Sequence, residues 1–299
     1  MNNPFFYEPD ALCLMAVEQM EELIAEHETW RDEVEQGKMF GVLVVERATA
    51  HGIQLGYLAA FSGQLGGKAT WEGFVPPVFD YLQPDGYFKT HEREISEINA
   101  RLSEMECNPL LKKLKTQIAH EQETAETALN AYRTMMAEAK NEREERRKQG
   151  STDEEMAAMV AESQFQKAEL RRLKQRIKTQ VEHLQEQLNG LESAMADLKV
   201  ERKRLSDALQ RWLFQQFEML NARGERCNLL DIFAPTPQRT PPAGTGECCA
   251  PKLLQYAFAM GYRPLSMAEF WLGQSPKNEI RREGAFYPAC QGKCGPTLG

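Results

Sequence analysis

The stretch that decides the fold is residues 181–209, which read VEHLQEQLNGLESAMADLKVERKRLSDAL. Apolar residues recur in it at alternating spacings of three and four residues, and only one position of this series is polar. The positions are Val181, Leu184, Leu188, Leu191, Met195, Leu198, Arg202, Leu205 and Leu209. This spacing is typical of the seam of a two-stranded coiled coil, sustained here over about four heptads. A helix this polar is only marginally stable alone in water, so its apolar face must pack against the apolar face of another helix.

The preceding segment supplies that partner. From about His91 the apolar residues again step by three and four. Asn108-Pro109 predicts a restart or kink, since proline is tolerated in the first turn of a helix. Gly150 predicts the end of the first helix, and Ser151 or Thr152 the start of the next. We therefore predict an antiparallel coiled-coil arm over residues 91–222, whose longer helix spans roughly 100 Å.

Residues 1–90 predict a small α+β domain. A helix is expected over residues 9–35, with Asp10 as its N-cap. One apolar face is expected to contain Leu12, Met15, Ala16, Leu23 and Ile24. Two short runs rich in β-branched and apolar residues, 40–45 and 53–61, predict paired strands.

Residues 223–299 predict an irregular, partly helical segment that packs with the N-terminal domain. Proline and glycine cluster at residues 235–244, and residues 249–272 are aromatic-rich and read as helical in part. The whole chain is thus predicted to be α+β and mostly α. It combines a small α/β N-terminal end, a long antiparallel helical hairpin and a small C-terminal end.

Charge is unevenly distributed along the chain. Residues 1–90 hold 14 acidic and 5 basic residues, whereas residues 223–299 hold 6 acidic and 9 basic residues. Aromatic and arginine side chains together can stack on single-stranded bases. The residues expected to contact RNA are therefore in the C-terminal segment: Lys252, Arg263, Lys277, Arg281 and Arg282. Burial in a small core is the alternative for most of the aromatic residues.

The arm itself carries two groups of basic residues. They are Arg171, Arg172, Lys174, Arg176 and Lys178, and then Lys199, Arg202, Lys203 and Arg204. A solvated coiled-coil face with glutamate partners would explain both groups. Contact with the phosphates of an RNA backbone is the alternative.

The chain contains seven cysteines, of which Cys248, Cys249, Cys290 and Cys294 lie near the C-terminus. The Cys290 and Cys294 spacing suits zinc, but adjacent cysteines bind one ion awkwardly, and no histidine follows His183. We therefore expect buried or free thiols, and no cofactor. No apolar run approaches the length of a membrane helix, and the first residues lack the basic and apolar regions of a signal peptide, so a cytoplasmic location is expected.

Several separated stretches resemble one protein family. They read GKMFGVLVV (37–45), LGYLAAFSG (55–63), GFVPPVFD (73–80), GECCAPKLLQYA (246–257), AEFW (268–271) and FYPACQGKC (286–294). Together they resemble the long N-terminal extension of a bacterial group of RluA-type RNA pseudouridine synthases, with a helical insertion between them. The resemblance implies an accessory region that positions ribosomal or transfer RNA for the enzyme's catalytic module.

The resemblance also shows what the chain lacks. The family's catalytic Asp follows Arg-Leu and precedes Thr-Ser-Gly, and no aspartate here has that context. Walker, Gly-x-Ser-x-Gly, His-Glu-x-x-His and dinucleotide motifs are absent as well. Whether the chain belongs to an enzyme thus depends on a catalytic module expected beyond Gly299, where the chain looks truncated. The alternative is a non-enzymatic coiled-coil interaction module, which could self-associate through its arm.

Overall fold

A three-stranded antiparallel sheet joins segments from the two ends of the sequence, in the order β2-β1-β5. Its strands are β1 (Lys38–Thr49), β2 (Gly52–Phe61) and β5 (Arg263–Leu272). The computed structural model describes residues 1–5, 8–277 and 279–298. It confirms the predicted β1–β2 pair. In contrast, residues 263–272 form a strand beside β1, where the sequence indicated only a partly helical segment.

One helix covers each face of this sheet. On one side α1 (Ala11–Glu26) packs on Phe40, Val42 and Val44. On the other side α7 (Cys249–Ala259) packs on Leu43 and Val45. The alternation follows from the period of two along a strand, which sends successive side chains of β1 to opposite faces.

Gly41 allows α7 to lie close to β1. A Cβ added at this position would lie 2.7 Å from the Cβ of Cys249. The glycine therefore sets the close approach between helix and sheet on this face.

The predicted helix over residues 9–35 is divided into three pieces. After α1 come a 3-10 turn, Glu28–Trp30, and α2 (Arg31–Glu35). The predicted apolar face was wrong for Leu12 and Met15, which are 44% and 57% exposed. The buried face consists of Cys13, Ala16, Val17, Met20 and Ile24. This set also has helical spacing, and it forms a more continuous stripe than the predicted set.

Asp10 caps α1 as predicted, since its Oδ1 accepts a hydrogen bond from Cys13 N at 2.9 Å. We expect Asp10→Ala to lower the free energy of unfolding by about 1 kcal/mol, and Asp10→Asn to cost less. The Cys13 amide also lowers the pKa of Asp10, so the capping carboxylate stabilises the fold above the ordinary Asp pKa. That contribution is lost as the pH falls through the lowered pKa.

Urea denaturation of both variants at neutral and acidic pH checks this expectation. The advantage of the wild type over Asp10→Asn should shrink in acid. If Asn proved as costly as Ala at neutral pH, the cap would not be the source of the effect.

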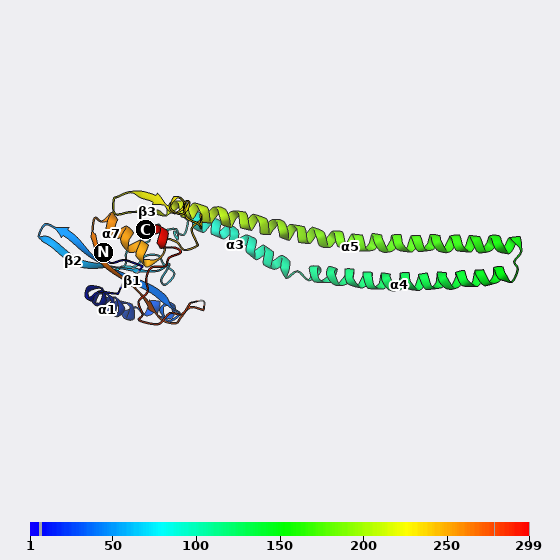
Figure 1. Cartoon of the computed structure of the whole chain (residues 1–299), viewed down its shortest axis with the longest axis horizontal. Helices are drawn as coiled ribbons and strands as arrows, with labels where there is room; N and C mark the ends of the chain where they lie inside the picture. Colours follow the sequence, from blue (N-terminus) through cyan, green and yellow to red (C-terminus); the bar gives the residue numbers. More distant parts are fainter. Residues whose placement is uncertain (6–7, 278, 299) are drawn as a thin grey trace. The chain divides into compact units, whose positions relative to one another are not determined.

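The second unit, residues 95–204, is an antiparallel helical hairpin, as Figure 1 shows. The helices that form it are α3 (Tyr87–Glu106), α4 (Pro109–Lys148) and α5 (Asp153–Gln216). Ion pairs cross between them in antiparallel order: Glu106–Lys199 at 2.8 Å, Lys115–Glu192 at 2.9 Å and Arg143–Glu162 at 3.3 Å. Leu188 of the seam packs on Leu114 and Ile118. The predicted helical hairpin and the mostly α fold class are therefore confirmed.

The breaks between these helices lie where the sequence placed them. The Asn108 side chain accepts a hydrogen bond from Leu110 N at 2.9 Å, and α4 begins at Pro109. Gly150 has φ +89° after the end of α4. Thr152 and Glu155 then exchange backbone-to-side-chain hydrogen bonds of 2.8 and 3.3 Å, which form a capping box.

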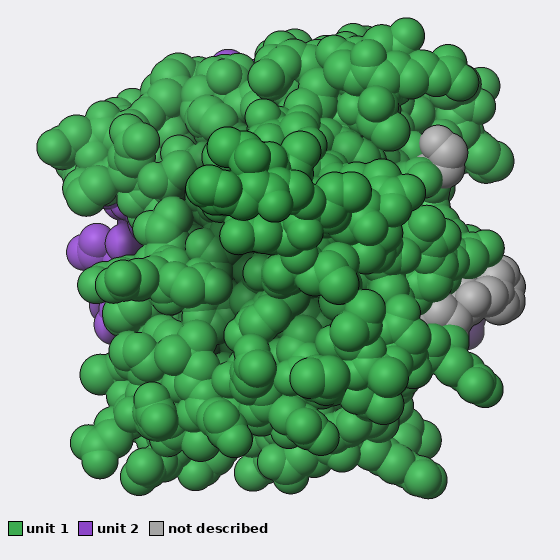
Figure 2. All heavy atoms as spheres, turned by 90° about the vertical axis from the view of Figure 1, so that its left-hand side faces the viewer, with its two compact units in different colours: residues 1–94, 205–299 green, residues 95–204 purple. Residues whose placement is uncertain are grey.

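The first unit combines residues 1–94 with residues 205–299. Figure 2 shows this unit, in green, as one continuous body. It also contains the pair β3 (Glu218–Leu220) and β4 (Arg226–Asn228), and the short helices α6 (Leu229–Phe233) and α8 (Gly295–Leu298).

The arm ends earlier than the expected boundary at residue 222. Phe214 and Phe217 pack with Val78 and Phe79, so the last turns of α5 belong to the core of the first unit. No helix among the described residues is both long and apolar enough to cross a membrane.

Candidate functional site

The five basic residues predicted to contact RNA do not form one cluster. Lys252 lies in α7, and Arg263 begins β5. Lys277, Arg281 and Arg282 follow β5 in the chain. Each has a different environment, and only some of them are available to a ligand.

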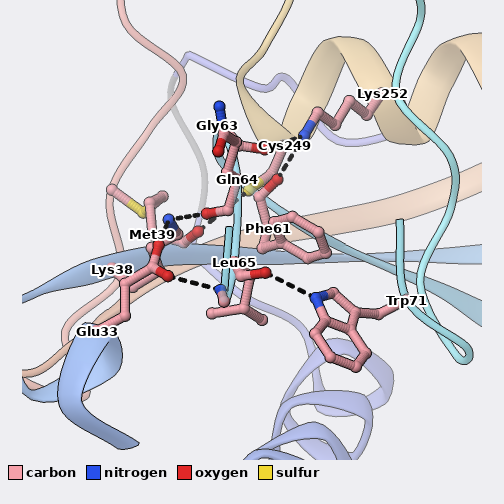
Figure 3. Close-up of polar contacts among 11 residues, drawn as sticks. Glu33, Lys38, Met39, Phe61, Gly63, Gln64, Leu65, Trp71, Cys249 and Lys252 are labelled. Carbon is pink, nitrogen blue, oxygen red and sulfur yellow. Dashed lines mark hydrogen bonds and ion pairs between the residues drawn. The ribbon is translucent and has the colours of Figure 1, made fainter. Parts of the chain in front are cut away.

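Lys252 corrects the sequence-based expectation. Its side chain extends from α7 toward the end of β2 (Figure 3), and the residue is 3% exposed. The ammonium donates to the carbonyl oxygens of Phe61 at 2.9 Å and Gly63 at 3.0 Å. Burial lowers the pKa of Lys252, because a charge loses hydration there. In this position Lys252 joins α7 to β2, and its buried ammonium is not accessible to a phosphate.

Arg281 is also engaged within the fold. Its guanidinium makes three hydrogen bonds of 2.8–3.0 Å with the Glu279 carboxylate. It also lies over the rings of Trp271 and Tyr287, at 5.2 and 4.7 Å from their centroids. The side chain is only 16% exposed. These contacts hold the segment after β5 against the strand.

The other three residues remain at the surface. Arg263 is 70% exposed and pairs with Glu46 across the sheet, which lowers the pKa of Glu46. Lys277 and Arg282 are exposed, and the structure gives neither an ion pair with another described residue. Two unpaired cations form a sparse surface for a polyanion.

A denser group of cations lies on the arm. We call residues 167–178 the α5 basic stretch. It contains six basic residues and one acidic residue, Glu169. The basic residues are Lys167, Arg171, Arg172, Lys174, Arg176 and Lys178, and all are exposed. Lys167 was not among the residues noted in the sequence, although its spacing of four from Arg171 places it on the same helical face.

Only two of these six side chains have acidic partners among the described residues. Arg172 pairs with Glu169, and Lys178 pairs with Glu182 at 3.7 Å. In the second basic group of the arm two of the four side chains are paired, Lys199 with Glu106 and Arg204 with Glu201. A solvated face with glutamate partners therefore describes the second group better than the first.

Three cysteines converge in the first unit. The sulfur atoms of Cys248, Cys290 and Cys294 all lie within 4.8 Å of one another. We call these residues the cysteine cluster. Cys294 is buried, Cys248 is partly buried and Cys290 is exposed. Both Cys294 N and Gly295 N donate to the carbonyl oxygen of Cys290, at 3.1 and 3.2 Å, which folds this segment into a tight turn.

Cys249 does not belong to the cluster. Cys248 has extended backbone angles as the N-cap of α7, and Cys249 is the first helical residue. The Cys249 sulfur lies 3.5 Å from Met39 O, against β1 (Figure 3). The change of backbone conformation at the helix start therefore separates the adjacent thiols, and it removes the geometric objection to a shared ligand.

The cluster lies in an unusual electrostatic environment. Hydrogen bonds with Cys248 and Cys294 lower the pKa of Cys290 below that of an ordinary thiol. The hydrogen bond with Cys290 raises the pKa of Cys248 to about 12. Nearby, burial raises the pKa of Glu269 to about 7, although its carboxylate accepts a hydrogen bond from Ala250 N at 3.1 Å.

The chain matches no protein-family model, no curated protein and no solved structure with which it was compared. Its function is therefore inferred from its residues and their arrangement.

Proposed function

We propose that this chain is the accessory, RNA-positioning region of an RNA pseudouridine synthase, and that it works beside a separate catalytic module in the cytoplasm. The stretches that resemble the family's N-terminal extension supply β1, β2, α7, β5 and the cysteine segment. All of them fall in the first unit, whereas the helical insertion forms the second. This division supports the interpretation of a family-like body with an added arm.

The observation that carries RNA binding is the α5 basic stretch. Lys167, Arg171, Lys174 and Lys178 are spaced by four, three and four residues, so they lie along one face of α5. Neighbours at this spacing are about 5–6 Å apart. Four exposed cations in a row can neutralise successive phosphates of an RNA strand.

The packing of the arm favours a polar partner. The apolar seam of α5 is covered by α4 of the same chain, as the contacts of Leu188 show. Charged outer faces are then left for recognition. The RNA proposal therefore gives a role to the exposed cations of the α5 basic stretch, most of which have no acidic partner among the described residues.

The test replaces Lys167, Arg171, Lys174 and Lys178 together by glutamine, which preserves helix propensity. Affinity for transfer RNA and ribosomal RNA transcripts is measured at several salt concentrations. We expect weaker binding, and a salt slope reduced by about 0.7 for each single-strand phosphate that the variant no longer neutralises.

The matched control replaces Lys199, Arg202, Lys203 and Arg204 by glutamine, which removes the same charge from the same helix. This variant should lose less affinity, because Lys199 and Arg204 are already paired. Equal losses in both variants would point to unspecific charge attraction, and no binding by the wild type at low salt would refute the proposal.

A further inference from the structure

The cysteine cluster differs from the other four cysteines of the chain. Cys13 and Cys249 are buried among apolar residues of the two cores, in separate places. Cys107 and Cys227 are exposed. Buried thiols usually behave as small apolar side chains, and such a role does not require three of them to meet. Convergence of three sulfur atoms therefore calls for another explanation.

The cluster joins two segments that are distant in the chain. Cys248 precedes α7, whereas Cys290 and Cys294 lie on the tight turn before α8. A spacing of three residues between two cysteines falls within the range of zinc-binding pairs. The third thiol comes from outside that turn, as is usual when a metal fastens a loop to a body.

The distances suit a tetrahedral ion. A Zn–S bond of about 2.3 Å places tetrahedral sulfur ligands about 3.8 Å apart. The three sulfur atoms already lie within 4.8 Å of one another. Small side-chain rotations would therefore bring all three into the coordination sphere, without movement of α7.

We propose that Cys248, Cys290 and Cys294 bind one Zn²⁺ as thiolates, with the fourth coordination position open toward solvent. Binding releases the thiol protons to water, and the soft sulfur ligands favour zinc over hard cations such as magnesium. The exposed side of Cys290 leaves room for a water molecule as the fourth ligand. Sites with three protein ligands and one water are typical of zinc that remains accessible to a further ligand.

A disulfide is the main alternative use of these thiols. It would join two of the sulfur atoms and leave the third without a role. Zinc uses all three, and it ties the turn at residues 290–294 to the start of α7. The bound metal should therefore stabilise the first unit, since a ligand that binds only the folded state raises its stability.

The test begins with the full chain, reduced and dialysed against zinc and then against metal-free buffer. Elemental analysis should find about one zinc per chain in the wild type and less than about a tenth of that in Cys290→Ser. Cys290 is exposed, so this variant should keep its fold, which circular dichroism checks. Cys107→Ser, a change at an exposed cysteine outside the cluster, should bind as the wild type does.

Anaerobic titration with Co²⁺ gives a second readout. Tetrahedral thiolate coordination produces intense ligand-field and charge-transfer bands, which should appear in the wild type and in Cys107→Ser and disappear on addition of zinc. Cys248→Ser should lose them as Cys290→Ser does. The proposal is overturned if the reduced wild type takes up no more metal than Cys290→Ser. It is also overturned if the isolated chain contains a disulfide between two of these cysteines and still binds no zinc once that disulfide has been reduced.

Discussion

Replacing Gly273 by alanine is expected to lower the free energy of unfolding of the first unit by about 3–5 kcal/mol, from backbone strain and overpacking together. Gly273 follows β5 directly and has φ +85°, a conformation that side chains disfavour. An added Cβ would lie 1.9 Å from Val34 O and 2.8 Å from Glu35 O. These are backbone atoms of α2, so no side-chain rotation relieves the clash. The neighbouring hydrogen bond from Gln274 N to Glu35 O, at 2.9 Å, would be strained as well.

Gly284→Ala is the matched control for this change. Gly284 has φ +70°, and no atom of the described residues lies within 4 Å of an added Cβ. Its alanine variant therefore carries backbone strain alone, of about 1–2 kcal/mol. The difference between the two variants measures the clash with α2. Equal losses would mean that the contact between α2 and the end of β5 contributes little.

Tryptophan fluorescence during urea denaturation is a suitable measurement. The four tryptophans, Trp30, Trp71, Trp212 and Trp271, all lie in the first unit. Their signal therefore reports the unfolding of this unit separately from the arm, which far-ultraviolet circular dichroism follows through its helices.

The arm could be predicted in detail because its determinants are local. Heptad spacing identifies the seam of α5, and Gly150 and Pro109 mark breaks through their own backbone preferences. None of these inferences needs knowledge of distant contacts. The strand β5 could not be predicted in the same way, because its pairing with β1 depends on a segment more than 200 residues away in the chain.

The face of α1 shows a similar limit. Two apolar stripes have helical spacing, one with Leu12 and Met15 and one with Cys13 and Val17. Only packing against β1 decides between them, and it selects the second. Periodicity thus predicts that a helix is amphipathic more reliably than it predicts which neighbouring stripe is buried.

The candidate sites were predicted unevenly for the same reason. The sequence places Cys248 beside Cys249, yet the start of α7 sends their side chains to different sites. The basic residues of the C-terminal segment look alike in sequence, but Lys252 is buried between α7 and the end of β2, while Arg282 is exposed. The sequence shows which side chains are charged and which are thiols. Only the folded structure shows which of these side chains are exposed and which are buried.

Lys252→Met is expected to destabilise the first unit by about 2–4 kcal/mol. Methionine preserves most of the volume of the lysine stem, so the packing of α7 is kept. The carbonyl oxygens of Phe61 and Gly63, however, each lose a charged donor that lies at 2.9 or 3.0 Å in the wild type (Figure 3). Hydrogen bonds to charged groups contribute about 1.5–3 kcal/mol each.

Two effects oppose each other in this variant. Removing the ammonium stabilises the folded state, because a charge no longer has to be buried. The same unfavourable burial lowers the pKa of Lys252. The carbonyl oxygens stay where they are, however, and a buried acceptor without a partner costs about 1–3 kcal/mol. Removing only one side of a buried polar contact is destabilising in general, so we expect the loss of the donors to outweigh the relief of the charge.

Lys277→Met, the same substitution at an exposed lysine, is the matched control and should change stability by less than about 0.5 kcal/mol. Urea denaturation followed by tryptophan fluorescence compares the two variants, and RNA titration of each one distinguishes a role in folding from a role in binding. If Lys252 held the fold together, its variant would lose stability, while RNA affinity measured well below the denaturation midpoint would stay unchanged. Unchanged stability together with weaker RNA binding would instead return Lys252 to the RNA-contacting surface, and would mean that the bonds to Phe61 and Gly63 do not persist in solution.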